Sequence, residues 1–258
     1  MALGHRTIVK LGRRSNLHSK QRDSVGAVSG DRLQVLRIGY LAGVLMAPLA
    51  LCLWAAAGGA AVLRVDVLDR DGAPVNDVVI VATPRHAPDT PALTAPSHAV
   101  MDQIERQFVP RILVIRTGTP VDFPNSDNIA HQVYSFSPAK RFQLSLYRGR
   151  VYPPLVFDKA GLVVIGCNIH DNMLGYIYVT SSPYFGKTDI HGTLYLEGLV
   201  GGDYAVSAWS PRFNEPEDQI LRDVQVAADA NPLLTLRLTQ PLSPEPRVKP
   251  AKAYRNEY

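Results

Sequence analysis

The chain has few cysteines. Its 258 residues include two Cys and two Trp, and 8% of the residues are aromatic. Cys52 lies inside an apolar run near the amino terminus, so cleavage of that run with a leader peptide would leave Cys167 alone. A single cysteine excludes an intramolecular disulfide framework. A free thiol in an oxidising compartment is a liability unless a metal ion holds it or burial hides it.

The chain also has no excess of positive charge beyond its first 61 residues. Its formal net charge is +4, but residues 1–61 contain eight Lys and Arg against two Asp and Glu, and the remainder contains nineteen against twenty-one. The basic character therefore belongs to the leader, and it does not describe a nucleic-acid-binding surface. We expect no nucleic-acid partner.

Residues 1–61 have the pattern of a secretory signal peptide with an extended basic part. The run from Ile38 to Ala57 is almost wholly apolar, Arg32 and Arg37 precede it, and small residues follow it. An uncleaved membrane anchor is the alternative, because roughly 20 apolar residues can span a bilayer. Both alternatives predict a periplasmic protein with no membrane contact beyond this segment.

From Ala61 onward, short β-branched and aromatic segments alternate with turn residues, and helical periodicity is absent. The pattern predicts an all-β chain made of β-sandwiches. Residues 84–96 are predicted to be a linker, residues 100–106 a short helix, and the proline-rich residues 241–258 a disordered tail. The predicted strands are residues 62–68, 78–83, 112–116, 121–123, 131–136, 142–147, 162–165, 176–179, 192–196, 204–209, 221–226 and 233–238.

The segment from Cys167 to Met173 offers a thiolate, an imidazole at His170 and a thioether within seven residues. His131 follows a separate hydrophobic segment and a polar turn, so it can complete the set. Two histidines, one cysteine and a weak methionine form the ligand set of a type 1, or blue, copper site. The ordinary alternative is a buried cysteine that acts as a small hydrophobic residue. The spacing of the methionine and the second histidine favours copper.

Two other kinds of site fit less well. Zinc would accept the cysteine and the histidines, but a thioether is a poor zinc ligand. An enzyme with Cys167 as nucleophile and His170 as base would need orienting and oxyanion-binding groups, and it would leave Met173 unexplained. We therefore expect that the protein is not an enzyme. His86 and His98 lie in loop-like segments, as does His191, and we expect all three at the surface.

The segment from about His98 to Val179 resembles a cupredoxin, on motifs in both of its halves, and residues 95–182 are the predicted copper domain. These motifs are Phe108-Val109-Pro110, Ile112-Leu113-Val114, Gly118, Val121-Asp122-Phe123, Asn125, Asp127, His131, Phe157-Asp158-Lys159-Ala160-Gly161 and Cys167-x-x-His170-x-x-Met173-x-Gly175. Within the cupredoxins the segment is most similar to the amicyanin and plastocyanin group and to methylamine utilization proteins. The resemblance implies a Greek-key β-sandwich that holds one copper ion per chain.

The resemblance also implies a role for each ligand. His131 and His170 would be the imidazole ligands, Cys167 the thiolate ligand and Met173 the long axial ligand. In this group the histidine on the ligand loop exposes one edge through an apolar patch, so His170 would be the point at which electrons enter and leave.

Three further residues are expected next to the ligands. Asn125 is one of the residues that carry the cupredoxin resemblance. Gln132 stands where these proteins often have asparagine after the first histidine, which leaves the tuning of the site open. Ile169 stands where a proline is frequent, and it keeps a backbone N–H group that could donate to the Cys167 sulfur and raise the reduction potential.

A second resemblance covers two separate segments. Residues 63–79 resemble the opening strands of a transthyretin-like, carboxypeptidase-regulatory-like β-sandwich, and residues 188–204 resemble its continuation. The hypothesis is that residues 62–90 plus 186–240 form one sandwich into which the copper domain is inserted. The alternative is a tandem pair of sandwiches in which the opening strands belong to the copper domain.

The sequence predicts a periplasmic mononuclear type 1 copper protein that carries single electrons between redox proteins. Its complexes with these partners would be transient and modest in area. The alternative function is copper binding for metal delivery or sensing, without electron transfer.

Overall fold

The computed structural model describes residues 60–86, 98–149, 152–214 and 219–245. All of them belong to one compact unit, residues 54–258. The predicted leader up to residue 59, most of the predicted linker and residues 246–258 of the predicted tail lie outside the described residues. Within the described ranges, no helix is long and apolar enough to cross a membrane.

Strands and turns make up the described part of the chain, so the all-β prediction is confirmed. The strands are β1 (Ala61–Leu68), β2 (Val79–Pro84), β3 (Ala99–Val100), β4 (Asp102–Ile104), β5 (Gln107–Val109), β6 (Ile112–Arg116), β7 (Thr119–Asp122), β8 (His131–Ser135), β9 (Phe142–Tyr147), β10 (Leu155–Phe157), β11 (Gly161–Gly166), β12 (Leu174–Thr180), β13 (Tyr184–Lys187), β14 (Thr193–Leu199), β15 (Gly202–Trp209), β16 (Gln219–Val226) and β17 (Leu233–Arg237).

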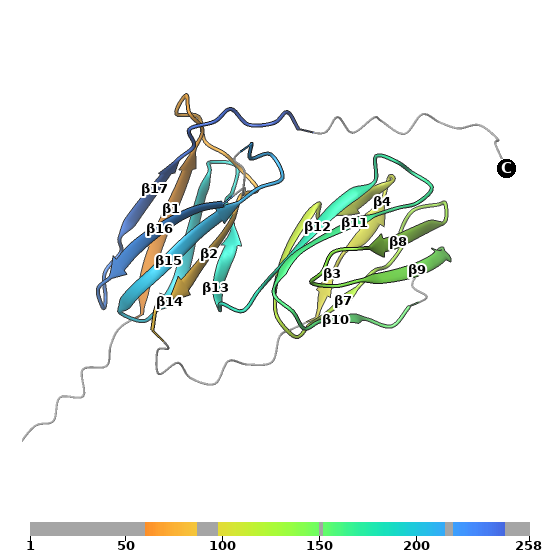
Figure 1. Ribbon diagram of the computed structural model, residues 1–258, viewed down its shortest axis with the longest axis horizontal. Helices are drawn as coiled ribbons and strands as arrows, with labels where there is room; N and C mark the ends of the chain where they lie inside the picture. Colours follow the sequence, from red (N-terminus) through yellow and green to blue (C-terminus); the bar gives the residue numbers. More distant parts are fainter. Residues whose placement is uncertain (1–59, 87–97, 150–151, 215–218, 246–258) are drawn as a thin grey trace, which may run out of the picture. The chain divides into compact units, whose positions relative to one another are not determined.

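Strands from the beginning of the described chain and strands from its end together form two sheets. One sheet has the order β14-β1-β17 and the other has the order β13-β2-β15-β16. Val65 of β1 pairs with Leu194 of β14 on one side and with Leu234 of β17 on the other. Figure 1 shows the consequence: the orange strands β1 and β2 lie beside the blue strands β15, β16 and β17. Apolar residues of both sheets form a common buried core.

The chain therefore leaves these two sheets after β2 and returns to them at β13, about 100 residues later. Ile80 of β2 pairs with Gly186 on one side and with Ala208 on the other. An insertion requires such pairings, whereas a tandem arrangement does not. The division into two domains and the transthyretin-like resemblance stay predictions.

Strands β3 to β12 form the sheets that carry the candidate site. A five-stranded sheet has the order β6-β12-β11-β8-β9, a three-stranded sheet has the order β10-β7-β3, and β4 and β5 form a hairpin. Alternate residues of β11 and β12, such as Val163, Ile165 and Ile177, face a shared core, as expected for strands with one buried face. Cys167 and Met173 belong to the same core.

The predicted short helix at residues 100–106 is wrong, because this segment contains strands β3 and β4 and the turn that leads to β5. Glu105 and Arg106 have φ angles of 50° and 59°. Two consecutive residues with positive φ make a tight hairpin turn whose twist matches that of the paired strands. Gln103 faces inward in this hairpin, where it is fully buried and donates a hydrogen bond to the carbonyl of Pro124.

Candidate metal centre

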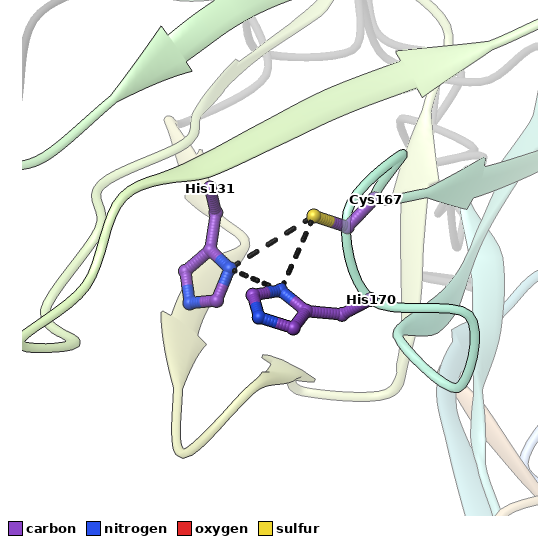
Figure 2. Close-up of side chains that lie close together, drawn as sticks. All are labelled: His131, Cys167 and His170. Atoms are coloured by element: carbon purple, nitrogen blue, oxygen red, sulfur yellow. Dashed lines mark hydrogen bonds between the residues drawn. The ribbon is translucent and has the colours of Figure 1, made fainter. Parts of the chain in front are cut away.

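His131 is the first residue of β8, and its side chain is fully buried. The strand positions it by pairing with β9, in which Tyr147 lies opposite His131. The ring turns Nδ1 toward the loop between β11 and β12, as Figure 2 shows. A fully buried imidazole needs partners for both ring nitrogens, since an unpaired polar atom in the core is costly.

Cys167 and His170 lie on this loop, which runs from the end of β11 to the start of β12. The loop is closed by two backbone hydrogen bonds: Cys167 N–H donates to the Met173 carbonyl at 3.2 Å, and Met173 N–H donates to the His170 carbonyl at 2.9 Å. Cys167 and Met173 are buried, whereas His170 is partly exposed. Because β11 and β12 are paired directly below it, the loop is held at both ends.

The three side chains form a compact triangle. The Nδ1 atoms of His131 and His170 are 3.1 Å apart, and Cys167 Sγ lies 3.9 Å from the first and 3.7 Å from the second. Figure 2 shows all three atoms facing a common point. A triangle with these sides has a point about 2.1 Å from each corner, which matches the roughly 2.0–2.3 Å at which nitrogen and sulfur bind a metal such as zinc. The donor set therefore fits a d-block metal ion.

In the described part of the chain, these residues are the one group of three potential ligands with this proximity. The sequence placed both histidines and the cysteine in the site, and the structure brings them together. The predicted fourth ligand, Met173, has a 2% exposed side chain in the core that also contains Cys167. His98 and His191 lie elsewhere, and both are exposed.

The surroundings of Cys167 favour the thiolate. Burial by itself raises the pKa of the thiol, but the hydrogen bond with His131 and backbone N–H groups of Gln132 and Ile169 outweigh burial and lower the pKa. The backbone donors come from β8 and from the ligand loop. Gln132 and Ile169, two of the three residues expected beside the ligands, thus contact the Cys167 sulfur through their backbone N–H groups. A thiolate is the form of cysteine that binds metal ions.

The two histidines differ in their electrostatic surroundings. Burial by itself lowers the pKa of His131, but its hydrogen bonds with Cys167 and Asp127 outweigh burial and raise the pKa. The pKa of His170 is lowered by burial, by the positive charge of His131 and by that of Arg106. Without a metal, a proton therefore binds His131 more readily than it binds His170.

The third expected neighbour, Asn125, braces the turn that precedes His131. Its side-chain amide donates to the carbonyls of Ile129 and Tyr147, both at 2.9 Å, and its side-chain oxygen accepts the N–H of Asp127 at 3.0 Å. Asn125 is almost fully buried. Its role is thus to fix the backbone of the turn, and the carboxylate of Asp127 makes the contact with the histidine.

Asp127 is a residue at this site to which the sequence assigned no role. Its Oδ2 lies 2.9 Å from Nε2 of His131 and accepts the backbone N–H of Arg106 at 2.8 Å. Burial by itself raises the pKa of this carboxyl, but the hydrogen bonds from His131, Arg106 and Asn128 outweigh burial and lower the pKa. In the sequence, Asp127 is one of the residues that carry the cupredoxin resemblance, and it lies four residues before His131 in a polar turn.

Comparison with known proteins gives similarities at the level of solved structures. No family model matches the chain, and no curated protein matches it. A purple cupredoxin from Nitrosopumilus maritimus is 21% identical, with a TM-score of 0.29 over 32% of this chain and 99% of that chain. An oxidized amicyanin variant is 21% identical, with a TM-score of 0.29 over 31% and 80%. A copper-containing nitrite reductase from Thermus scotoductus is 23% identical, with a TM-score of 0.30 over 38% of this chain and 25% of the reductase.

Proposed function

We propose that this protein binds one copper ion through His131, Cys167, His170 and Met173 and carries single electrons between redox proteins. The observation that carries the proposal is the triangle of two imidazole nitrogens and one sulfur. Copper, when bound, supplies a one-electron couple, because Cu(I) favours thiolate and thioether donors while Cu(II) favours imidazole nitrogen. The mixed donor set suits both oxidation states.

The protein's own contribution is to hold these donors in place. His131 is held by the β8–β9 pairing, and Cys167 and Met173 are held by the closed loop between β11 and β12. Buried donors fixed by paired strands move little when charge changes, and a site that does not rearrange exchanges electrons quickly. In this proposal the protein converts no substrate and is not an enzyme.

His170 is the proposed port for electrons. It is the partly exposed member of the three, whereas His131 and Cys167 are buried. Two exposed apolar residues of the same region, Ile169 and Leu174, offer a surface from which water is easily displaced. A transient redox partner would bind there. The leader pattern of residues 1–61 supports a periplasmic location for this exchange.

The test is a redox titration of the purified protein after addition of Cu(II). Electron transfer requires that the visible thiolate-to-copper absorption disappears on reduction and returns on oxidation over repeated cycles. The alternative, metal delivery or sensing, predicts copper binding without reversible cycling. Failure of the band to return, together with release of the metal on reduction, would reject the electron carrier in favour of the second function.

A further inference from the structure

Asp127 contacts the site from outside the predicted ligand set. It lies in the turn between β7 and β8, and its side chain is 12% exposed. Both carboxylate oxygens are engaged: Oδ2 faces Nε2 of His131 and accepts the N–H of Arg106, while Oδ1 accepts the N–H of Asn128 at 2.9 Å. A carboxylate with several N–H donors stays ionised, and an ionised carboxylate only accepts hydrogen bonds.

The Arg106 donor comes from a distant part of the chain. The turn of the β4–β5 hairpin, at Glu105 and Arg106, brings this N–H group to a residue 21 positions later. The same hairpin supplies Asp102, whose carboxylate accepts the hydroxyl of Ser126 at 2.7 Å. The hairpin thus fixes the turn that carries Asp127, and with it the direction in which the carboxylate faces.

A hydrogen-bond acceptor at Nε2 determines the tautomer of the neutral His131 ring. In a neutral imidazole one nitrogen carries the proton and the other carries the free lone pair. A neutral His131 that donates to Asp127, which only accepts, carries its proton on Nε2. The lone pair then lies on Nδ1, the atom that faces Cys167 and His170. A carboxylate behind a histidine ligand also makes the imidazole a stronger donor.

We propose that Asp127 is a positioning residue that orients His131 for the metal and, through its negative charge, favours the oxidised state of the site. This inference rests on the proposed copper function. The Asp127 carboxylate would attract the copper ion across the His131 ring. In this partly buried setting, the attraction corresponds to a tenfold or larger change in the relative affinity for Cu(II) and Cu(I). For a one-electron couple, a tenfold change equals about 59 mV.

The first test compares the reduction potentials of three copper-loaded proteins: the wild type, Asp127→Asn and Asp171→Asn. The amide of Asp127→Asn can still accept from Nε2 but carries no charge. Its reduction potential is therefore expected to lie at least about 59 mV above that of the wild type, which equals a tenfold change in the relative affinity for the two oxidation states. Asp171 is the matched control, because it is also an acidic neighbour of a ligand histidine but is exposed, so solvent screens its charge. Its substitution is expected to cause a smaller shift.

The second test uses the metal-free protein and its Asp127→Ala variant at a pH at which the His131 ring is neutral. Nitrogen NMR of the His131 ring distinguishes the two neutral tautomers. In the wild type, Nε2 is expected to carry the proton; in Asp127→Ala, both tautomers are expected. A purely structural role for Asp127 would lower the stability but leave the tautomer unchanged.

The outcomes separate this inference from the proposed function. If wild-type protein binds no copper, the proposed function fails, and the ring tautomer still tests the positioning role. If wild-type copper cycles normally but Asp127→Asn shifts the potential no more than Asp171→Asn does, the charge role of Asp127 is wrong. An unchanged tautomer in Asp127→Ala would overturn the positioning role.

Discussion

The Nδ1 atoms of His131 and His170 lie 3.1 Å apart, although 39 positions separate the two residues in the chain. At this distance two imidazolium rings would repel each other strongly, and a second proton on either ring, at Nδ1, removes the lone pair that a metal needs. The pKa of His131 is raised above its ordinary value of 6.5, whereas that of His170 is lowered.

As the pH is lowered from 8, copper affinity should therefore begin to fall before pH 6.5 is reached, because protons first compete at His131. The loss approaches about tenfold per pH unit while one proton competes, and it steepens at lower pH as His170 also becomes protonated. Competition titrations with a chelator between pH 8 and pH 5 measure this dependence. A constant affinity over that range would contradict the assignment of His131 as a ligand.

Substitution of Met173 should change the potential without loss of the metal. Met173→Leu removes the soft thioether but nearly conserves the volume, so the fold should lose less than about 1.5 kcal/mol. Copper should remain bound by the three other ligands, with a higher reduction potential.

The matched control is Met101→Leu, since Met101 is a fully buried methionine in the same core. This control should leave the potential unchanged. Voltammetry measures the reduction potentials of both variants. Equal shifts would show that Met173 acts through packing and not as a ligand.

The N–H group of Ile169 should raise the reduction potential, because a hydrogen bond to the thiolate withdraws electron density from the sulfur. Ile169→Pro deletes this donor and should lower the potential by an amount on the order of 60 mV, a tenfold change in the equilibrium. Ile169→Ala keeps the N–H group and serves as the control, with a potential near that of the wild type. If Ile169→Ala reproduced the fall, the lost side chain would be its cause.

Tyr147 should limit stability at alkaline pH. Burial raises the pKa of its hydroxyl to about 12, and the hydroxyl donates to the Phe123 carbonyl. In the unfolded chain the hydroxyl ionises near pH 10, so the unfolded state releases this proton first. The free energy of unfolding should therefore be unaffected below pH 10 and fall above it, by on the order of 1–3 kcal/mol.

Urea unfolding at pH 8 and pH 11 measures this loss. Tyr147→Phe should reduce the difference between the two pH values, whereas Tyr195→Phe, at an exposed position, should not. An identical alkaline loss in wild type and Tyr147→Phe would assign the effect to other groups.

The sequence predicted the parts of the site that depend on short-range spacing. Cys167 and His170 lie three positions apart, and strands such as β11 and β12 alternate clearly enough to be recognised. Met173 stays a predicted ligand. Asp127 could not be recognised in this way. Its contact with His131 depends on a turn, and the turn depends on a hairpin about twenty residues earlier in the chain.

The same limit explains the errors in secondary structure. Strands β3, β4, β5 and β10 have two or three residues each, too few for an alternating pattern to show. The turn at Glu105 and Arg106 contains no glycine or asparagine, the residues that usually mark positive φ angles. Tertiary contacts of Gln103 and Phe108 hold this hairpin, and such contacts leave no local trace in the sequence.

The most direct test of the central claim is a titration of the purified protein with Cu(II), followed by visible absorption, beside Cys167→Ser as the matched variant. We predict an intense blue thiolate-to-copper band that saturates at one copper per chain in the wild type and is absent from a folded Cys167→Ser protein. A well-folded wild-type protein that shows no such band, or a band that survives in Cys167→Ser, would contradict the assignment of the site.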